Sequence, residues 1–82
     1  MPLAMAKSGE RVIIKEMATG RVGRSRLESM GLRPGDHIEI INNTGQGRII
    51  LGRGLTRLAV GRGFAHKILV SLSDTVKDRE EM

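Results

Sequence analysis

The sequence contains no cysteine, no tryptophan and no tyrosine, and its single aromatic residue is Phe64. Without cysteine there is no disulfide framework, no thiolate zinc site and no cysteine nucleophile, so stability must come from packing or association. Proteins that grip single-stranded nucleic acids stack bases on aromatic rings, and grooves for proline-rich ligands are lined with them. The chain therefore lacks the usual equipment for both kinds of recognition.

Long apolar segments are also missing. No stretch reaches the roughly 20 apolar residues that a membrane-spanning helix needs. The first seven residues lack the basic and apolar regions of a signal peptide. Together with the absence of cysteine, this favours a cytoplasmic protein without membrane insertion. A chain of 82 residues has room for one small domain with a modest core.

Charge is distributed unevenly along the chain, which carries fourteen basic and nine acidic residues and a net charge of +5. Residues 1–73 hold twelve of the bases and five of the acids, a net charge of +7, whereas residues 74–82 hold the other two bases and four acids. We predict a folded domain over 1–73 and a charged C-terminal tail over 74–82. The basic domain favours an anionic partner, such as a protein surface, a nucleic acid or a charged membrane.

Short apolar segments separated by glycine predict five strands. The expected strands are residues 10–17, 37–42, 48–51, 56–60 and 68–72. Gly52-Arg53-Gly54 is expected to form the hairpin between the third and fourth strands. Strands at this spacing with tight turns indicate a small sandwich or barrel.

One short helix is predicted over residues 22–30, with Val22, Leu27 and Met30 on its buried face. Residues 64–67 are long enough for a single helical turn only. The chain thus has a mainly β pattern with one short helix between the first two strands.

A glycine-rich turn follows the predicted helix. Gly31 stands at the position of a left-handed C-terminal cap, and Leu32 can fold back onto the last helical turn. In the next turn Pro34 fixes φ and Gly35 can take positive φ. We expect these residues to end the helix and lead into the second strand.

Signatures of chemistry are weak throughout the sequence. No nucleophile, base and orienting acid form a recognisable set, so we do not expect an enzyme. The histidines His37 and His66 are far apart, and only Glu39 shares a predicted strand face with His37. Because a closed metal site needs three or four converging ligands, these three residues are weak candidates for a transition-metal site. Neither Gly-Arg-Gly segment has the spacing or the long helix of a phosphate loop.

Arginine is the most informative polar residue, with ten copies against four of lysine. A guanidinium group suits bidentate contact with carboxylate or phosphate, although a dispersed solvated surface is the alternative interpretation. The arginines fall around the predicted helix and on or beside the third and fourth strands: Arg21, Arg24, Arg26, Arg33, Arg48, Arg53, Arg57 and Arg62.

Three motifs occur in a distinctive order along the chain. Leu27-x-x-Met30-Gly-Leu-Arg-Pro-Gly35 is followed by a strand, a glycine loop, Gly54-Leu-Thr-Arg-Leu-Ala-Val-Gly-Arg-Gly63 and Ala65-x-Lys-Ile-Leu-Val70. This order, over about residues 3–72, resembles the FeoA family. These small cytoplasmic proteins accompany the bacterial and archaeal ferrous iron permease. The same module forms the C-terminal domain of iron- and manganese-dependent repressors.

The resemblance implies an SH3-like barrel of five strands, with the helix over one end of the barrel. It also implies a non-catalytic accessory protein that binds and regulates the ferrous iron permease at its cytoplasmic side. Members of the family are often linked to transition metal binding, for which this chain offers only His37, Glu39 and His66. The motif residues that carry over do so as turn formers: Gly31, Pro34, Gly35, Gly54, Gly61 and Gly63.

The barrel implied by the resemblance predicts a core. Its expected members are Val12, Ile14, Leu27, Met30, Leu32, Ile38, Ile40, Ile50, Leu58, Val60, Ala65, Ile68 and Val70.

A docking module is the first functional hypothesis, with Arg53, Arg57 and Arg62 as the contacts to the cytoplasmic domain of the permease. Two alternatives stay open, a nucleic-acid-binding SH3-like barrel and a transition-metal-binding regulatory module. The high basic charge favours the first alternative, and the aromatic count disfavours it. Small barrels with few core residues often associate, so a homo-oligomer is also expected to be accessible.

Overall fold

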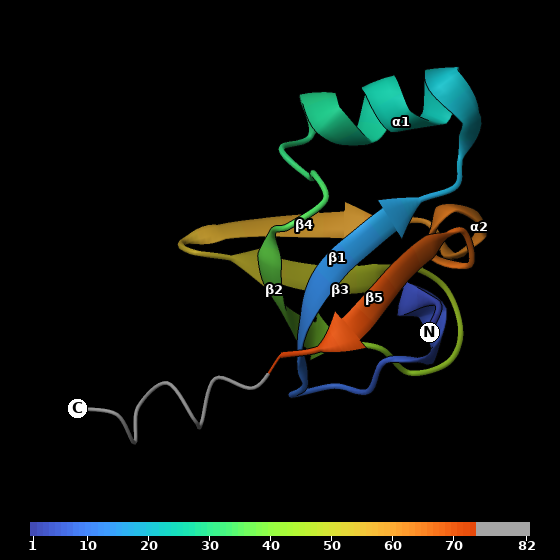
Figure 1. The fold of residues 1–82 in the computed structure, drawn as a ribbon. Helices are drawn as coiled ribbons and strands as arrows, with labels where there is room; N and C mark the ends of the chain where they lie inside the picture. The colour runs from blue at the N-terminus through green and yellow to red at the C-terminus, as the bar shows by residue number, and fades with distance from the viewer. Residues whose placement is uncertain (74–82) are drawn as a thin grey trace.

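The computed structural model describes residues 1–73, so the predicted charged tail over 74–82 lies outside the described residues. Figure 1 shows the arrangement of the elements, which confirms the mainly β pattern with one short helix between the first two strands. Among the described residues, no helix has both the length and the apolar character to cross a membrane. The elements are the 3₁₀ helix η1 (Leu3–Met5), β1 (Arg11–Met17), α1 (Gly20–Ser29), β2 (His37–Asn42), β3 (Ile49–Arg53), β4 (Thr56–Val60), α2 (Arg62–Ala65) and β5 (Ile68–Leu72).

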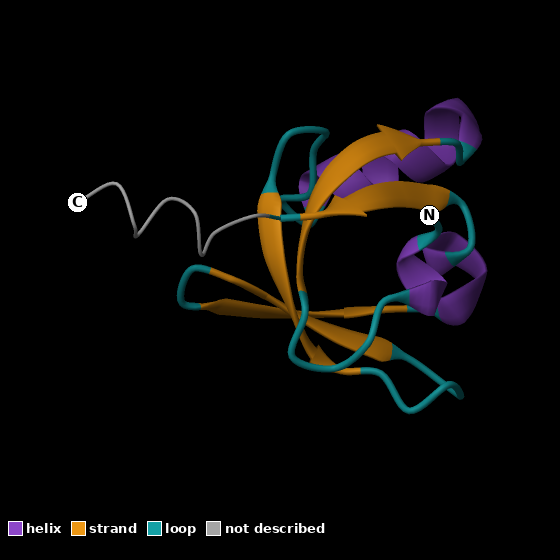
Figure 2. Ribbon diagram, turned by 60° about the horizontal axis from the view of Figure 1, so that its bottom comes forward, coloured by secondary structure: helices purple, strands orange, loops and turns teal. Residues whose placement is uncertain are grey.

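All five strands form one antiparallel sheet in the order β4-β3-β2-β1-β5. Figure 2 shows this sheet curled around its own inner face, as in a small barrel. Register shifts between Ile14 and Glu16 in β1 and between Ile40 and Asn42 in β2 mark the places where these strands depart from regular pairing. In β1 the shift also changes the side-chain alternation, so that Met17 is buried although the predicted core did not include it.

The end of α1 confirms the predicted glycine cap. Gly31 has φ +95°, and its N–H donates to the Glu28 carbonyl at 2.9 Å. The Leu32 N–H donates to the Leu27 carbonyl at 3.0 Å, and both leucine side chains are fully buried. This is the Schellman arrangement, in which the reversed chain covers the last helical turn with an apolar contact. It directs the chain from α1 back toward the sheet.

The other motif glycines divide into two groups. Gly35 and Gly54 have positive φ values of 95° and 61°. Gly61 has φ −63°, and Gly63 lies within α2 outside the positive-φ region. The backbone at these last two positions therefore suits any residue, which is unexpected for glycines predicted to form turns.

The core fills the inside of the curled sheet. Ten of the expected core residues are buried, and Met30 and Leu58 are partly buried and pack against them. The buried residues are Leu3, Ala6, Val12, Ile14, Met17, Leu27, Leu32, Ile38, Ile40, Ile49, Leu51, Val60, Ala65, Ile68 and Val70. Leu3 belongs to η1, which packs against β5 and α2 and was not predicted.

The prediction for Ile50 is wrong. Ile49 and Leu51 point into the core, and Ile50 is only half-buried on the other face of β3. Because residues 49–51 are all apolar, the sequence holds no alternation that could set the phase of this strand. β3 also continues through Gly52 to Arg53, so the hairpin turn is at Gly54-Leu55 rather than at the first of the two glycines.

The prediction for Val22 is also wrong, because its side chain is 81% exposed. Gly23 and Leu27 form the buried face of α1 instead. A Cβ at Gly23 would lie 3.1 Å from Cε1 of Phe64, so the missing side chain lets α1 approach α2 closely. α2 itself begins at Arg62, two residues before the predicted helical turn.

The phase of β3 can be tested by comparing Ile49→Ala with Ile50→Ala. We expect Ile49→Ala to lower the free energy of unfolding by about 2–5 kcal/mol, because it leaves a cavity in the core. Ile50→Ala is expected to cost about 1 kcal/mol, since its side chain is only half-buried. Urea denaturation followed by circular dichroism measures both values. Equal losses for the two variants would contradict the observed phase.

Candidate functional site

The β3–β4 hairpin tip, which we define as residues 53–57, is the most prominent exposed feature of the sheet. The Arg53 and Thr56 positions pair, and Gly54 with positive φ makes the tight turn between them. Figure 1 shows this hairpin projecting from the barrel. Leu55 at its tip is completely exposed. The fold itself makes no use of this apolar side chain.

The guanidinium groups of the two hairpin-tip arginines each lie beside a glycine. A Cβ at Gly31 would lie 2.6 Å from Nη2 of Arg53, so the Arg53 side chain crosses from the hairpin to the end of α1. A Cβ at Gly52 would lie 2.9 Å from Nη1 of Arg57. The Nε of Arg53 is buried and has no hydrogen-bond partner within residues 1–73. Both guanidinium groups are thus held close to backbone, and one keeps an unused donor.

Arg62 lies apart from the other two predicted contact arginines. It follows β4, at the end of that strand opposite the hairpin turn. Its Nε donates to the Gly47 carbonyl at 3.0 Å, and its Nη2 donates to Oδ1 of Asn43 at 2.9 Å. Arg53 and Arg57 therefore belong to one hairpin, whereas the Arg62 side chain is engaged with the β2–β3 loop. Because Arg57 pairs with Gly52 and Arg53 pairs with Thr56, the two arginine side chains leave opposite faces of the hairpin.

Asn43 is the polar centre of this second region and was not singled out from the sequence. Its Nδ2 donates to the carbonyls of Ala4 at 3.1 Å and Ala6 at 2.6 Å, and its Oδ1 also accepts from the Gly45 N–H at 3.0 Å. One side chain thus joins the N-terminal segment, the β2–β3 loop and Arg62. The only signal in the sequence was the Asn-Thr-Gly order, which is typical of a turn.

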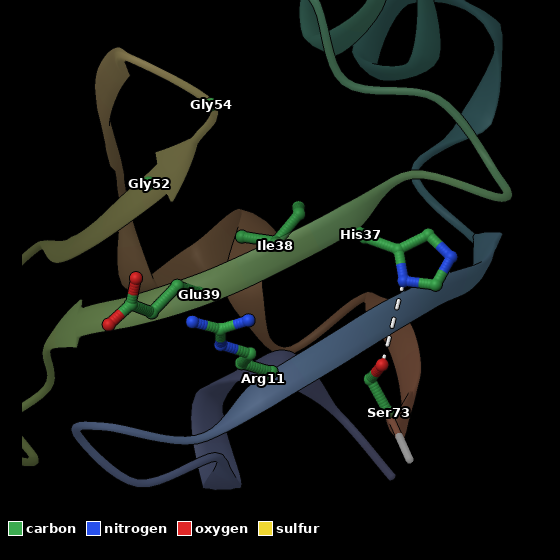
Figure 3. A pocket seen from close by; sticks show the side chains of 7 residues that line it. All are labelled: Arg11, His37, Ile38, Glu39, Gly52, Gly54 and Ser73. Atoms are coloured by element: carbon green, nitrogen blue, oxygen red, sulfur yellow. Dashed lines mark hydrogen bonds between the residues drawn. The ribbon is translucent and has the colours of Figure 1, made fainter. Parts of the chain in front are cut away.

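A shallow hollow of about 270 Å³ lies on β2 beside the hairpin, and we call it the β2 hollow (Figure 3). It is lined by Arg11, His37, Ile38, Glu39, Gly52, Gly54 and Ser73. Nδ1 of His37 lies 3.5 Å from Oγ of Ser73. Arg11 pairs with Glu39 in the β1–β2 register, so the Glu39 carboxylate already has a guanidinium group as its neighbour.

The β2 hollow contains two of the three weak metal candidates. His66 caps α2 and does not line the hollow. Within residues 1–73, no three His, Cys, Asp or Glu side chains come close enough together to hold a metal ion. The Arg11 guanidinium would also repel a metal ion placed beside Glu39. The described residues therefore do not fit a closed metal site.

Comparison with known proteins identifies relatives of the whole described domain. Residues 1–72 match the model of the FeoA domain. A protein of Methanocaldococcus jannaschii named Fe(2+) transport protein A is 37% identical over 81 residues, which cover 99% of this chain and 98% of that protein.

Solved structures show the same fold. The crystal structure of an iron uptake regulatory protein, FeoA, is 33% identical, with a TM-score of 0.83 over 89% of this chain and 97% of that one. FeoA of Stenotrophomonas maltophilia, described as an SH3 domain protein and solved in complex with zinc, is 17% identical. Its TM-score is 0.69 over 87% of this chain and 89% of that one, a likeness that shows the SH3-like fold.

Arg62 is hydrogen-bonded to the β2–β3 loop and Arg57 is exposed, and this difference leads to a prediction about stability. We expect Arg62→Ala to lower the free energy of unfolding by about 1–3 kcal/mol, because it removes two hydrogen bonds from a charged donor. Arg57→Ala is expected to change it by no more than about 0.5 kcal/mol, as is usual for an exposed side chain. Thermal unfolding of the purified variants measures both. Loss of stability in Arg57→Ala but not in Arg62→Ala would contradict the structural role assigned to the Arg62 hydrogen bonds.

Proposed function

The chain belongs to the FeoA family, and from this premise we propose that it is a cytoplasmic accessory protein of ferrous iron uptake that binds and regulates the ferrous iron permease. It acts by association and has no reaction of its own. The similar proteins support this proposal, since their names describe iron transport and the regulation of iron uptake. The proposed partner is the cytoplasmic domain of the permease.

The observation that carries this proposal is the composition of the β3–β4 hairpin tip. A completely exposed leucine, Leu55, stands between two arginines at the end of a projecting hairpin. When a partner covers an exposed leucine, the burial of its apolar surface stabilises the complex. An aliphatic side chain that enters a pocket can anchor an interface, and arginine is enriched at interfaces over the rest of the surface. The tip therefore suits an apolar pocket with an acidic rim.

Charge complementarity supports an acidic partner surface over a neutral one. The domain over residues 1–73 carries +7, and the tip contributes two guanidinium groups to this charge, those of Arg53 and Arg57. Opposite charges around an apolar contact raise the association rate and fix the orientation of the complex. Arg53 brings in addition a buried Nε without a partner within residues 1–73.

Acidic substitutions at the tip test this surface. We expect Arg57→Glu and Leu55→Asp each to raise the Kd for the cytoplasmic domain of the permease by about tenfold or more, because each removes a central contact. Isothermal titration calorimetry at physiological salt measures this change. Arg26→Glu, at an exposed position in the last turn of α1, makes the same change in net charge as Arg57→Glu away from the tip and is expected to leave the Kd within about threefold.

Two results would contradict the proposal. One is unchanged affinity in both tip variants, which would remove the hairpin as the contact. The other is the absence of permease binding by the unaltered protein together with binding of a nucleic acid duplex whose affinity falls steeply with salt. That second result would favour the nucleic-acid-binding alternative.

A further inference from the structure

A second concave surface lies at the end of the sheet opposite the hairpin. We call it the Phe64 hollow. It has a volume of about 370 Å³ and is lined by Thr19, Gly61, Gly63, Phe64 and Lys67. These residues come from the segment before α1, from α2 and from the segment that leads into β5. Figure 1 shows α2 at the far end of β4 from the hairpin turn.

Neither the backbone conformation nor the packing of residues 1–73 requires glycine at the two glycine positions of the hollow. A Cβ at Gly61 or Gly63 would meet no atom within 4 Å, and neither residue needs positive φ. By contrast, a Cβ at Gly23 or Gly31 would press on a neighbouring side chain. Glycine within a helix is destabilising relative to alanine, so Gly63 in α2 carries a cost that the fold does not explain. A close approach by another molecule would explain it.

The floor of the hollow is apolar and fixed in position. Phe64 is the only aromatic residue of the chain, and it is partly buried against the core. Gly23 of α1 lies close enough to the ring that a Cβ there would be 3.1 Å from Cε1 of Phe64. The ring is thus held between α1 and the core and also lines the hollow. A fixed aromatic floor suits a bulky apolar side chain.

The rim of the hollow is positive. Lys67 is exposed at the edge. The first turn of α1 contains no acidic residue, and Thr19 makes no side-chain capping bond to it. The start of α1 therefore leaves backbone donors and the positive end of the helix dipole uncompensated. A ligand that brings carboxylates to this rim gains a favourable interaction with both features.

We propose that the Phe64 hollow binds a bulky apolar side chain carried on an acidic segment of the permease's cytoplasmic part. Gly61 and Gly63 let the backbone of that segment approach α2, and Lys67 with the start of α1 faces its carboxylates. The proposal rests on the function proposed above and adds a second contact at the opposite end of β4. A second copy of this chain is a poorer occupant, because its exposed Leu55 is flanked by arginines that Lys67 would repel.

Filling the hollow tests the proposal without disturbing the fold. We expect Gly63→Gln, which places a long polar side chain in the hollow, to raise the Kd for the permease domain by about tenfold or more. Its melting temperature is expected to stay equal or rise, because glutamine is a better helix former than glycine. Lys67→Glu is expected to weaken binding and reduce its dependence on salt. Ser25→Gln, at an exposed position of α1 outside the hollow, is the matched control and is expected to leave the Kd unchanged.

A synthetic peptide separates this inference from the function on which it rests. The probe is acetyl-Glu-Glu-Leu-Glu-Glu-amide, added to ¹⁵N-labelled full-length protein and to its Gly63→Gln variant. We expect amide shifts at Gly61, Gly63 and Lys67 that the variant loses. Peptide shifts without any permease binding would overturn the proposed function and leave the hollow as an acidic-peptide site.

Three results would overturn the proposal that the Phe64 hollow binds an acidic segment of the permease. Permease binding that is equal in the unaltered protein and in Gly63→Gln would do so while the proposed function stands. Peptide shifts confined to the β3–β4 hairpin tip would also do so. Self-association that Gly63→Gln abolishes would show that a second copy of the chain, and not an acidic segment, fills the hollow.

Discussion

The close approach of α1 to the barrel is the constraint on which the rest of the structure depends. Two glycines take part in it, Gly23 within the helix and Gly31 just after its C-cap. Gly23 lies against Phe64 of α2, and Gly31 lies under the guanidinium of Arg53 from the hairpin. A Cβ at Gly23 would press on Thr19 and Phe64, so the helix and α2 are positioned together. Gly31 needs its φ of +95° to turn the chain from the helix back toward the sheet. The Leu27–Leu32 contact then buries the remaining apolar face.

The candidate surfaces lie at the two ends of β4, and each has a side chain packed against a glycine in or just after α1. The hairpin tip is supported from behind by the packing of Arg53 on Gly31, and the Phe64 hollow is supported by the packing of Phe64 on Gly23. At the end of β4 that leads to the Phe64 hollow, Arg62 and Asn43 connect the chain after β4 to the β2–β3 loop and the N-terminal segment. Rigid support of this kind lowers the entropy lost when a surface binds its partner.

Local rules of the sequence predicted the strands and the end of α1, because glycine at position 31 and apolar alternation each have one structural solution. These rules failed where the local sequence was compatible with more than one structure. Three apolar residues in a row left the phase of β3 open, and a glycine on the buried face of α1 hid that face from a search for apolar periodicity. Long-range polar contacts, such as those of Asn43, leave little trace in the sequence. The contact roles of Arg53, Arg57 and Arg62 stay predictions, and the structure places the first two in the hairpin tip and Arg62 beyond the other end of β4.

Chemical-shift mapping with the permease domain tests the central claim most directly. The ¹⁵N-labelled protein, over its full length, is titrated with the unlabelled cytoplasmic domain of the permease at physiological salt. We expect the perturbed amides to cluster at the two ends of β4, over residues 53–57 and around Gly61 and Gly63. Perturbations confined to the β2 hollow or the exposed face of α1, or no perturbation at all, would contradict docking through these surfaces.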